Sequence, residues 1–479
     1  MTEAQTDSQE TPRQEHGRDL TQGSIPRLLL AFCWPLLLGN MIQAGYSIVN
    51  RFWVGQYLGA DALAAITVTM QVSFILIAIA NGITLGSSIL VSQFVGACNW
   101  DGVRRVVQSA VVVIGALSII LLILGQFLAV PLLKAVNTPE HAFPLAISYM
   151  RLFLCSFPLV FMAILTTFLL RGVGDSLTPL IFQGAGVILT AILDPLLMLG
   201  WFGFPKLGLN GTAVAMLIAQ TIGIVTFFIY LQRKNHVVAP DWGHLRVDRA
   251  ISKMILVIGL PSAAQQLLVS VGSAGILFIV NGFHENATAA FGAASQIDML
   301  AFFVAMSFSM AISSLAGQNI GAGRYERIRE IFWWGLLLSG GITLVCSGLA
   351  VHYAHVVMRI FIQPQMHPEA FRIGVEYLHI VGFSYVIIAV MFVCLGITNG
   401  AGHTFVAALM TLLGLWVVRL PLAAFLSYRL HSVTGIWYAM VISFTVSMLF
   451  SLWYYFSGRW KRTVINHGPA TPLVDEAVA

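Results

Sequence analysis

Charged side chains are scarce in this sequence. Asp, Glu, Lys and Arg make up 9% of the 479 residues, hydrophobic residues make up 58%, and the mean hydropathy is +0.85. Soluble domains carry about 25% charged residues, so this composition excludes an ordinary soluble globular protein. It predicts an integral membrane protein built of helices, because a helix satisfies its own backbone hydrogen bonds inside a bilayer.

Apolar runs long enough to cross a bilayer recur along the whole chain. Each crossing needs about 20 residues of helix. We predict an all-α fold with about twelve transmembrane helices. The predicted spans are 28–52, 61–86, 106–132, 144–169, 177–201, 209–232, 254–280, 287–312, 331–362, 374–398, 404–428 and 434–457.

Cysteine is also sparse. The five cysteines are odd in number and scattered, so the sequence predicts neither disulfide bonds nor a metal cluster. The spans hold no pairing of a nucleophile with a general base, and the GAGRYER segment lacks the ending of a phosphate-binding loop. We therefore predict that the protein is not an enzyme and binds neither a metal nor an organic cofactor.

The basic residues are concentrated at alternate connections between the spans. Examples are Arg104 and Arg105, and the basic residues of segment 233–253. By the positive-inside rule these connections and both termini are cytoplasmic. The net charge of +5 is therefore explained by a lipid bilayer rather than by nucleic acid as the partner.

The chain divides into two predicted bundles. Residues 1–27 are polar and mixed in charge, which predicts a disordered cytoplasmic tail rather than a signal peptide. An N-terminal six-helix bundle follows at 28–232, then a cytoplasmic linker at 233–253 and a C-terminal six-helix bundle at 254–458. Residues 459–479 are predicted to form a second cytoplasmic tail.

An internal repeat relates the two bundles. At a constant offset of 225 residues, Gln71 aligns with Gln296 and Gln93 with Gln318. Each half holds an even number of spans, so both enter the membrane in the same orientation. A parallel repeat of this kind is typical of transporters that bind substrate between the halves and alternate access by rocking them.

The first span carries a polar helical face. Asn40, Gln43, Tyr46 and Asn50 are spaced by three or four residues, so they lie on one side of a helix. This face either lines a substrate cleft or forms hydrogen bonds to neighbouring helices. Gln265 and Gln266, just after Pro261, are candidates for the same cleft from the C-terminal half.

Two carboxylates stand inside apolar spans. Asp194 lies in ILTAILDPLLMLG, and Asp298 lies in SQIDMLAFF. An aspartate at the centre of a membrane helix costs roughly 2.5 to 3.5 kcal/mol on insertion scales, so each is a candidate functional residue. Asp194 is either a cation switch or a structural residue preceding Pro195. Asp298 is a second protonation site, a counter-charge for a cationic substrate, or a hydrogen-bonded packing residue.

Several motifs resemble one known family. They are YSIVNRFWVGQYLGADALAA (46–65), SQFVGACN (92–99) with GQNIGAGR (317–324), LLRGVGDSLTP (169–179), LDPLLMLG (193–200), GLNGTAVA (208–215) and VRLPLAAFL (418–426). In this order and repeated across both halves, they resemble the prokaryotic branch of the multidrug and toxic compound extrusion (MATE) family. The resemblance covers roughly residues 25–460.

The resemblance implies twelve helices in two bundles, a central cleft, and export driven by inward proton or sodium flow. Prokaryotic members carry a coupling aspartate in the first helix, and here that position is Asn50, which excludes simple proton coupling at this residue. Thr167 and Thr190 stand where the family usually has asparagines, whereas Tyr46 and Asp194 keep the expected residue types. The implied coupling network is therefore Asp194, Asn50, Tyr46, Thr190 and Thr167, with Asp298 as a second site.

The predicted function is secondary active export of amphipathic, often cationic drugs or toxic organic compounds in exchange for protons or sodium. The alternative is a flippase-like exporter of a lipid-linked or other endogenous metabolite. Its cleft should hold several basic residues within the spans, and the sequence shows almost none there. The resemblance implies a monomer in a bacterial inner membrane that transports small-molecule substrates.

Overall fold

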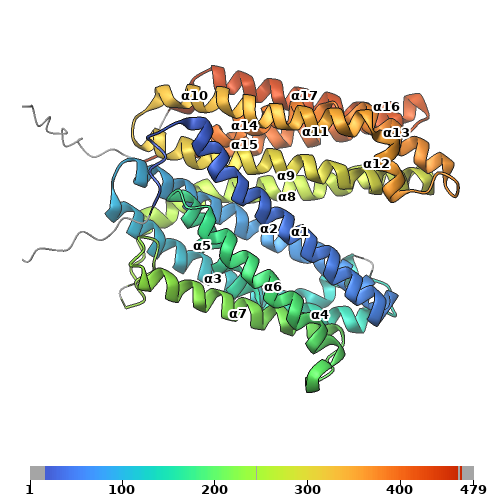
Figure 1. The fold of residues 1–479 in the computed structure, drawn as a ribbon, viewed down its shortest axis with the longest axis horizontal. Coiled ribbons are helices and arrows are strands. Elements are labelled where there is room, and N and C mark those ends of the chain that lie inside the picture. The colour runs from blue at the N-terminus through green and yellow to red at the C-terminus, as the bar shows by residue number, and fades with distance from the viewer. Residues whose placement is uncertain (1–16, 137, 244, 462–463, 466–479) are drawn as a thin grey trace, which may run out of the picture.

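The computed structural model describes residues 17–136, 138–243, 245–461 and 464–465. All regular elements of this described part are helical (Figure 1). Ten helices are long and apolar enough to cross a membrane, and two bent pairs of shorter helices raise the number to twelve. The predicted all-α membrane fold is confirmed.

The N-terminal lobe is built from the first half of the chain. Its elements are α1 (Ile25–Leu58), α2 (Ala60–Gly96), α3 (Trp100–Ala135), α4 (Phe143–Cys155), α5 (Phe157–Gly172), α6 (Leu177–Leu199), the short helix η1 (Trp201–Gly203) and α7 (Leu209–Arg233). Helices α4 and α5 form one bent span, with an angle of 48° between them.

The C-terminal lobe repeats this arrangement. Its elements are α8 (Arg249–Asn281), α9 (Glu285–Gly321), α10 (Tyr325–Gly335), η2 (Leu336–Gly340), α11 (Gly341–His352), α12 (Ala354–Phe361), α13 (Pro368–Val381), α14 (Ser384–Gly400), α15 (Thr404–Thr411), η3 (Leu412–Arg419), α16 (Leu420–Leu430), α17 (Thr434–Phe456) and η4 (Arg459–Lys461). Helices α13 and α14 form the second bent span, with an angle of 47°.

Several helices differ from their predicted extents: α2 and α9 end later than predicted, at Gly96 and Gly321, and two spans are interrupted. The predicted span 331–362 ends earlier, because the helix stops at His352 and the apolar segment Ala354–Phe361 forms the separate helix α12. The predicted span 374–398 begins earlier, at Pro368, and is broken at Gly382 and Phe383. A proline at the first helical position starts a helix readily, because its missing N–H needs no partner there.

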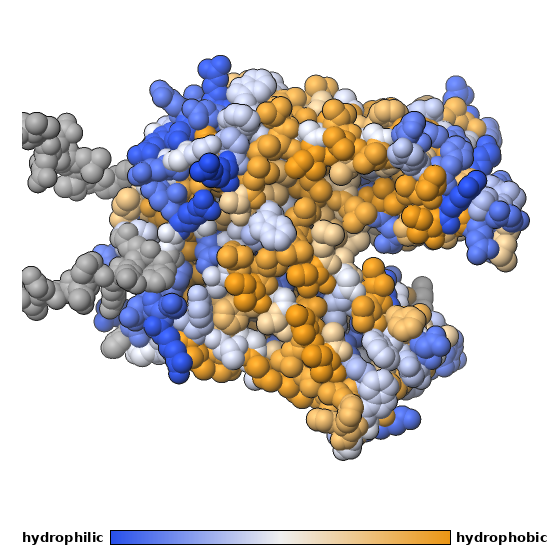
Figure 2. Space-filling view, viewed as in Figure 1, coloured by the Kyte–Doolittle hydropathy of each residue, from blue (hydrophilic) through white to orange (hydrophobic). Residues whose placement is uncertain are grey.

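The lobes meet at one end of the molecule and separate at the other. At the meeting end, which we call the closed end, glycines at the ends of α2 and α9 lie directly on the backbone of the other lobe, Gly96 on Gln318 and Gly321 on Gln93. At the opposite end, which we call the open end, a hollow separates the lobes in the space-filling view (Figure 2). The two lobes are therefore in contact at one end and apart at the other.

Two helices cross between the lobes. The first half of α1 packs in an apolar cluster with α9 and α10, and its second half continues toward the N-terminal lobe (Figure 1). Reciprocally, Ile251, Ile255 and Ile258 of α8 are buried in the core of the N-terminal lobe. Both crossing helices contain a proline, Pro35 in α1 and Pro261 in α8. The predicted bundles at 28–232 and 254–458 are thus interleaved through their first helices.

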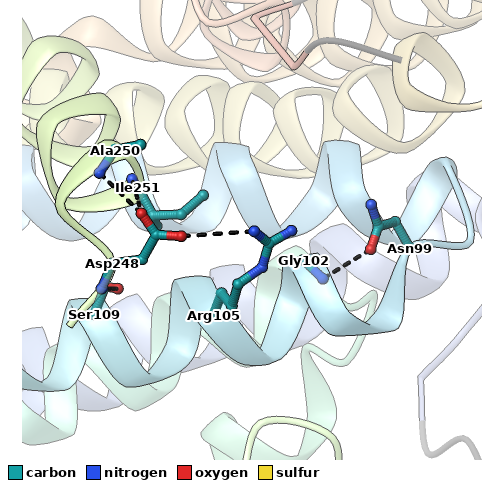
Figure 3. A network of polar contacts seen from close by, with 7 residues as sticks. All are labelled: Asn99, Gly102, Arg105, Ser109, Asp248, Ala250 and Ile251. Carbon is teal, nitrogen blue, oxygen red and sulfur yellow. Dashed lines mark hydrogen bonds and ion pairs between the residues drawn. The ribbon is translucent and has the colours of Figure 1, made fainter. Parts of the chain in front are cut away.

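The connection between the lobes is shorter than predicted and docks on α3. It runs from 234 to 248, because α7 continues to Arg233 and α8 begins at Arg249. Asp248 accepts hydrogen bonds from the backbone N–H groups of Ala250 (2.9 Å) and Ile251 (3.2 Å), and so caps α8. Its second oxygen lies 3.6 Å from Arg105 (Figure 3). This linker is therefore fixed to the N-terminal lobe at its last residue.

The predicted tail at residues 1–27 is wrong for its final part. Residues 1–16 lie outside the described residues, but Leu20 and Thr21 are buried and α1 already begins at Ile25. The backbone N–H of Leu20 donates to Gln318 Oε1 (2.9 Å) and that of Arg18 to the Val173 carbonyl (3.1 Å). Residues 17–24 therefore join the two lobes at the closed end.

Candidate functional site

Asp194 is the centre of a polar site in the N-terminal lobe. It is 1% exposed and lies in the open-end half of α6. Its Oδ2 accepts hydrogen bonds from the Tyr46 hydroxyl (3.0 Å) and from Asn50 Nδ2 (2.9 Å). Because Tyr46 and Asn50 are four residues apart on α1, one helical face presents both donors to the carboxylate. The structure thus brings together three residues of the predicted network.

The other carboxylate oxygen of Asp194 accepts no hydrogen bond from the described residues. Oδ1 is buried and has no hydrogen-bond partner among the described residues. A buried carboxylate oxygen without a donor is costly, whereas a proton or a cation at that oxygen removes the cost. The arrangement can therefore bind one small cation and keep Oδ2 fixed while doing so.

The two threonines of the predicted network form no hydrogen bond to Asp194. Thr190 is buried one helical turn before Asp194, but its hydroxyl donates to the Gly186 carbonyl of its own helix (2.8 Å). Thr167 is partly buried on α5, and no hydrogen bond joins it to Asp194 in the described structure. The geometry places neither of them on the carboxylate.

The polar residues of α1 contact different helices. Asn40 Nδ2 donates to Ser307 Oγ on α9 (3.4 Å), so it links α1 to the C-terminal lobe. Gln43 is exposed. The one face that the sequence predicts therefore makes an inter-lobe contact at one end and holds Asp194 at the other.

The two glutamines of α8, Gln265 and Gln266, also differ in their hydrogen bonds. Gln265 Nε2 donates to Thr411 Oγ1 at the end of α15 (2.9 Å), whereas no hydrogen bond links the Gln266 side chain to the described residues. Both are partly buried. Gln265 therefore joins two helices of its lobe, and the cleft position of Gln266 stays a prediction.

A second carboxylate site lies inside the C-terminal lobe. Asp298 of α9 is 9% exposed, and its two oxygens accept hydrogen bonds from the hydroxyls of Tyr377 and Tyr385. These tyrosines flank the break between α13 and α14. Asp298 therefore ties both halves of the broken span to α9, and both of its oxygens are occupied, unlike those of Asp194.

Arg419 is a partly buried arginine that was not among the candidate residues chosen from the sequence. It lies within the continuous span Thr404–Leu430, at the last residue of η3, a segment of π-helix. Its Nε donates to Ser443 Oγ (2.7 Å), and its guanidinium lies 4.1 Å from the centroid of the Phe444 ring. The only signal in the sequence was an arginine inside an apolar run.

The candidate sites hold few metal ligands. The described residues contain no group of three or more His, Cys, Asp or Glu side chains that could hold a metal ion. Around Asp194 the neighbouring ligands are a phenol and an amide, so the site suits a proton or a weakly held monovalent cation rather than a transition metal.

Comparisons with known proteins give one consistent family. The MatE family model matches residues 35–196 and 261–425, one segment in each lobe. The chain is 30% identical over 450 residues to a probable multidrug resistance protein, YoeA, of Bacillus subtilis, covering 92% of this chain and 96% of that protein. It is 27% identical over 436 residues to a FAD transporter of Shewanella oneidensis, covering 90% and 94%.

A solved structure shows the same fold. It is described as the outward-facing conformation of a multidrug resistance MATE family transporter, and it matches with a TM-score of 0.85 and 22% sequence identity over 92% of this chain and 98% of that one. Since the family model and the relatives extend over both lobes, the chain belongs to the MatE family of multidrug efflux transporters and is a multi-pass membrane protein.

Proposed function

We propose that this transporter is a secondary antiporter that exports amphipathic, often cationic compounds in exchange for protons or sodium. The observation that carries the proposal is the geometry of Asp194. One of its oxygens is held by Tyr46 and Asn50, and the other is buried without a partner in the described structure. A carboxylate held in this way can accept and release a cation without losing its position.

The two-lobe architecture supports alternating access. The open-end hollow admits solutes from one side, while the glycine contacts of α2 close the other side. Because α1 and α8 each belong to both lobes, binding events on α1 can change the relative position of the lobes. Asp194 bonds α1 to α6, so loading its free oxygen alters the contact between a crossing helix and its lobe.

We assign the closed end to the cytoplasm. Arg104 and Arg105 begin α3 at this end, and Arg324 and Arg327 bond to the backbone of Thr21 and Gly23 there. Cytoplasmic connections of membrane proteins are enriched in Lys and Arg. The structure then corresponds to an outward-open state, in which cations enter from outside.

The coupling role is tested by Asp194→Asn in sealed proteoliposomes. Export of a fluorescent lipophilic cation is driven by a proton gradient and, separately, by a sodium gradient. An amide cannot take up a proton, so we expect Asp194→Asn to abolish gradient-driven export, a loss of at least tenfold in initial rate, while binding of the dye persists.

The matched control is Asp61→Asn, which makes the same chemical change at an exposed carboxylate of the same lobe. We expect it to transport like the unmodified protein. Gradient-driven export that survives in Asp194→Asn would show that Asp194 is not the coupling residue. The gradient that drives transport in the unmodified protein identifies the coupling ion.

A second candidate function is export of an endogenous metabolite. Two observations favour it: one relative is described as a FAD transporter, and Arg419 places a cation within a span. Competition separates the two functions, because an exporter of anionic metabolites is inhibited by excess flavin nucleotide, whereas a drug exporter is inhibited by lipophilic cations.

A further inference from the structure

A cavity of about 590 Å³ lies at the closed end of the N-terminal lobe. Its walls come from residues 17–18, the first half of α1, the connection from α5 to α6, the end of α7 and the segment that follows α7. None of the described residues that line it belongs to the C-terminal lobe, so the cavity is separate from the hollow between the lobes. Its charged, polar and large aromatic lining residues include Arg18, Trp34, Asp175, Ser176, Tyr230 and His236.

The mouth of this cavity faces the lipid. Trp34 and Leu177 line the cavity and are 58% and 53% exposed, and Ile181, one turn farther along α6, is also exposed. Large apolar side chains on the outside of a membrane-spanning helix contact lipid tails. Trp and Tyr are enriched where the lipid headgroups meet the hydrocarbon, and Trp34 and Tyr230 both border the cavity. The cavity therefore lies at headgroup depth, and the apolar surface of α6 continues from it into the bilayer.

Ser176 places an unpaired hydroxyl in the cavity wall. The residue is 6% exposed, and its side chain forms no hydrogen bond to the described residues, not even as a cap of α6. Asp175 caps that helix instead, because its Oδ1 accepts from the backbone N–H groups of Leu177 and Thr178, both at 3.0 Å. A buried hydroxyl without a partner is unfavourable, and a hydrogen bond to a ligand in the cavity removes this cost.

The charges that line the cavity are of both signs. No ion pair joins Arg18 to a carboxylate in the described part of the chain, and Asp175 uses only Oδ1 for the helix cap. A phosphate group complements the Arg18 guanidinium, and an ammonium group complements the second oxygen of Asp175. A headgroup that carries only negative charge would place like charges together at Asp175. The cavity therefore favours a ligand with one group of each charge.

We propose that this cavity binds a phospholipid whose headgroup carries both a phosphate and a primary ammonium, as in phosphatidylethanolamine. The phosphate contacts Arg18 and Ser176, the ammonium contacts Asp175, and one acyl chain follows the exposed apolar surface of α6. With the closed end in the cytoplasm, the lipid belongs to the cytoplasmic leaflet. Pro35 of α1 lines the same cavity, so the lipid joins a crossing helix to α6.

Three phospholipids that differ only in the headgroup test this site. Delipidated protein in detergent is titrated with acyl-chain-labelled phosphatidylethanolamine, phosphatidylcholine and phosphatidylglycerol, and binding is measured by fluorescence anisotropy. The trimethylammonium of the choline lipid donates no hydrogen bond, and the glycerol lipid has no ammonium. A charge-assisted hydrogen bond therefore predicts that the ethanolamine lipid binds about tenfold more tightly than either of the others. Excess glycerophosphoethanolamine, which lacks acyl chains, should not displace it, and displacement would overturn the assignment to a lipid.

Three variants change the proposed contacts one at a time. Asp175→Asn keeps the cap of α6, because an amide oxygen also accepts backbone N–H groups, but it removes the charge that holds the ammonium. We expect the preference for the ethanolamine lipid over the choline lipid to disappear. Arg18→Gln should weaken binding of all three lipids severalfold, because each carries a phosphate. Ser176→Ala removes a hydroxyl that the fold itself does not use, so it should weaken lipid binding without lowering the unfolding temperature.

The matched controls are Asp101→Asn and Arg27→Gln. They make the same chemical changes at exposed side chains of the closed end that do not line the cavity, so the three affinities should stay unchanged. An unmodified protein without preference for the ethanolamine lipid, or a preference that persists in Asp175→Asn, would show that the cavity is not an aminophospholipid site. These measurements need neither an ion gradient nor a transported dye, so their outcome is independent of the Asp194 experiment.

Discussion

Asn50 gives the N-terminal site an amide where the family resemblance implies an acid. As an amide it donates a hydrogen bond to Asp194 Oδ2 at 2.9 Å and cannot itself carry a proton. The site therefore holds one carboxylate, where the family resemblance implies two acids. Under the coupling that we propose at Asp194, one carboxylate with two neutral donors exchanges a single cation per cycle, so we expect a simple dependence of transport on the concentration of the driving ion.

Asn50→Asp should change that dependence. Two carboxyl groups sharing one site titrate as a coupled pair, because the charge of one affects proton binding at the other. We expect the pH optimum of export to shift or its ion dependence to steepen, measured as initial export rates in proteoliposomes between pH 5 and 9.

The control for this change is Asn99→Asp at the cap of α3, where both residues accept the Gly102 N–H equally well. It should leave the pH profile intact. An Asn50→Asp profile that coincides with that of the unmodified protein would place Asn50 outside the coupling network.

Residue-level prediction from sequence succeeded where a single chain segment carries the signal. Asp194 stands out as a charge in an apolar run, and its contact with Tyr46 and Asn50 follows from one helical face. The partners of Asp298 were missed, because Tyr377 and Tyr385 come from a different helix and only tertiary packing brings them together. Arg419 was not chosen as a candidate, although it lies inside the predicted span 404–428, because basic residues were considered only at the connections.

At the level of elements, hydropathy alone does not predict the bends in the two bent spans. An apolar run predicts that a segment crosses the membrane, but it carries no information on a break within it. The break at Gly382 is stabilised from outside the span, because Ser347 Oγ of α11 donates to the Gly382 carbonyl (2.6 Å). Tyr377 and Tyr385 on either side are bonded to Asp298 of α9.

Asp298→Asn should loosen this broken span without ending coupled transport. The amide nitrogen of Asn is a donor, so one tyrosine hydroxyl loses its acceptor inside the lobe. Leaving a buried polar group unsatisfied costs about 1–3 kcal/mol, and we expect a lower thermal unfolding temperature in detergent, with proton-driven export retained.

Asp61→Asn serves again as the surface comparison and should not lower the unfolding temperature. The opposite pattern for Asp298→Asn, an unchanged unfolding temperature with lost coupling, would make Asp298 the ion switch and Asp194 a structural residue.

At the scale of the whole molecule, the repeat predicted from the sequence places two equivalent hydrogen bonds at the closed end. Gln93 Nε2 of α2 donates to the Gly400 carbonyl of the opposite lobe (2.9 Å), and Gln318 Nε2 of α9 donates to the Gly172 carbonyl (3.0 Å). The two bonds join equivalent pairs of residues, with the donor on the N-terminal lobe in one bond and on the C-terminal lobe in the other. The sequence predicted the equivalence of the glutamines but not that each reaches across to the other lobe.

The same symmetry makes glycine indispensable at the crossing of α2 and α9. A Cβ at Gly96 would overlap the Gln318 carbonyl, and one at Gly321 would overlap the Gln93 carbonyl. Both obstacles are backbone atoms, so neither can move without separating the helices. The closed end therefore exists only while both positions lack a side chain.

Gly96→Ala should shift the transporter toward the state in which the closed end opens. The added methyl group clashes only while α2 and α9 are in contact, so it destabilises the outward-open state relative to its alternative. Spin labels at Phe202 and Met366, exposed residues at the open end of the two lobes, report this by electron paramagnetic resonance. We expect their separation to shorten in Gly96→Ala. Gly223→Ala, with open space around its Cβ, should keep the original distance, and equal distances in both variants would show that the glycine contact does not set the conformation.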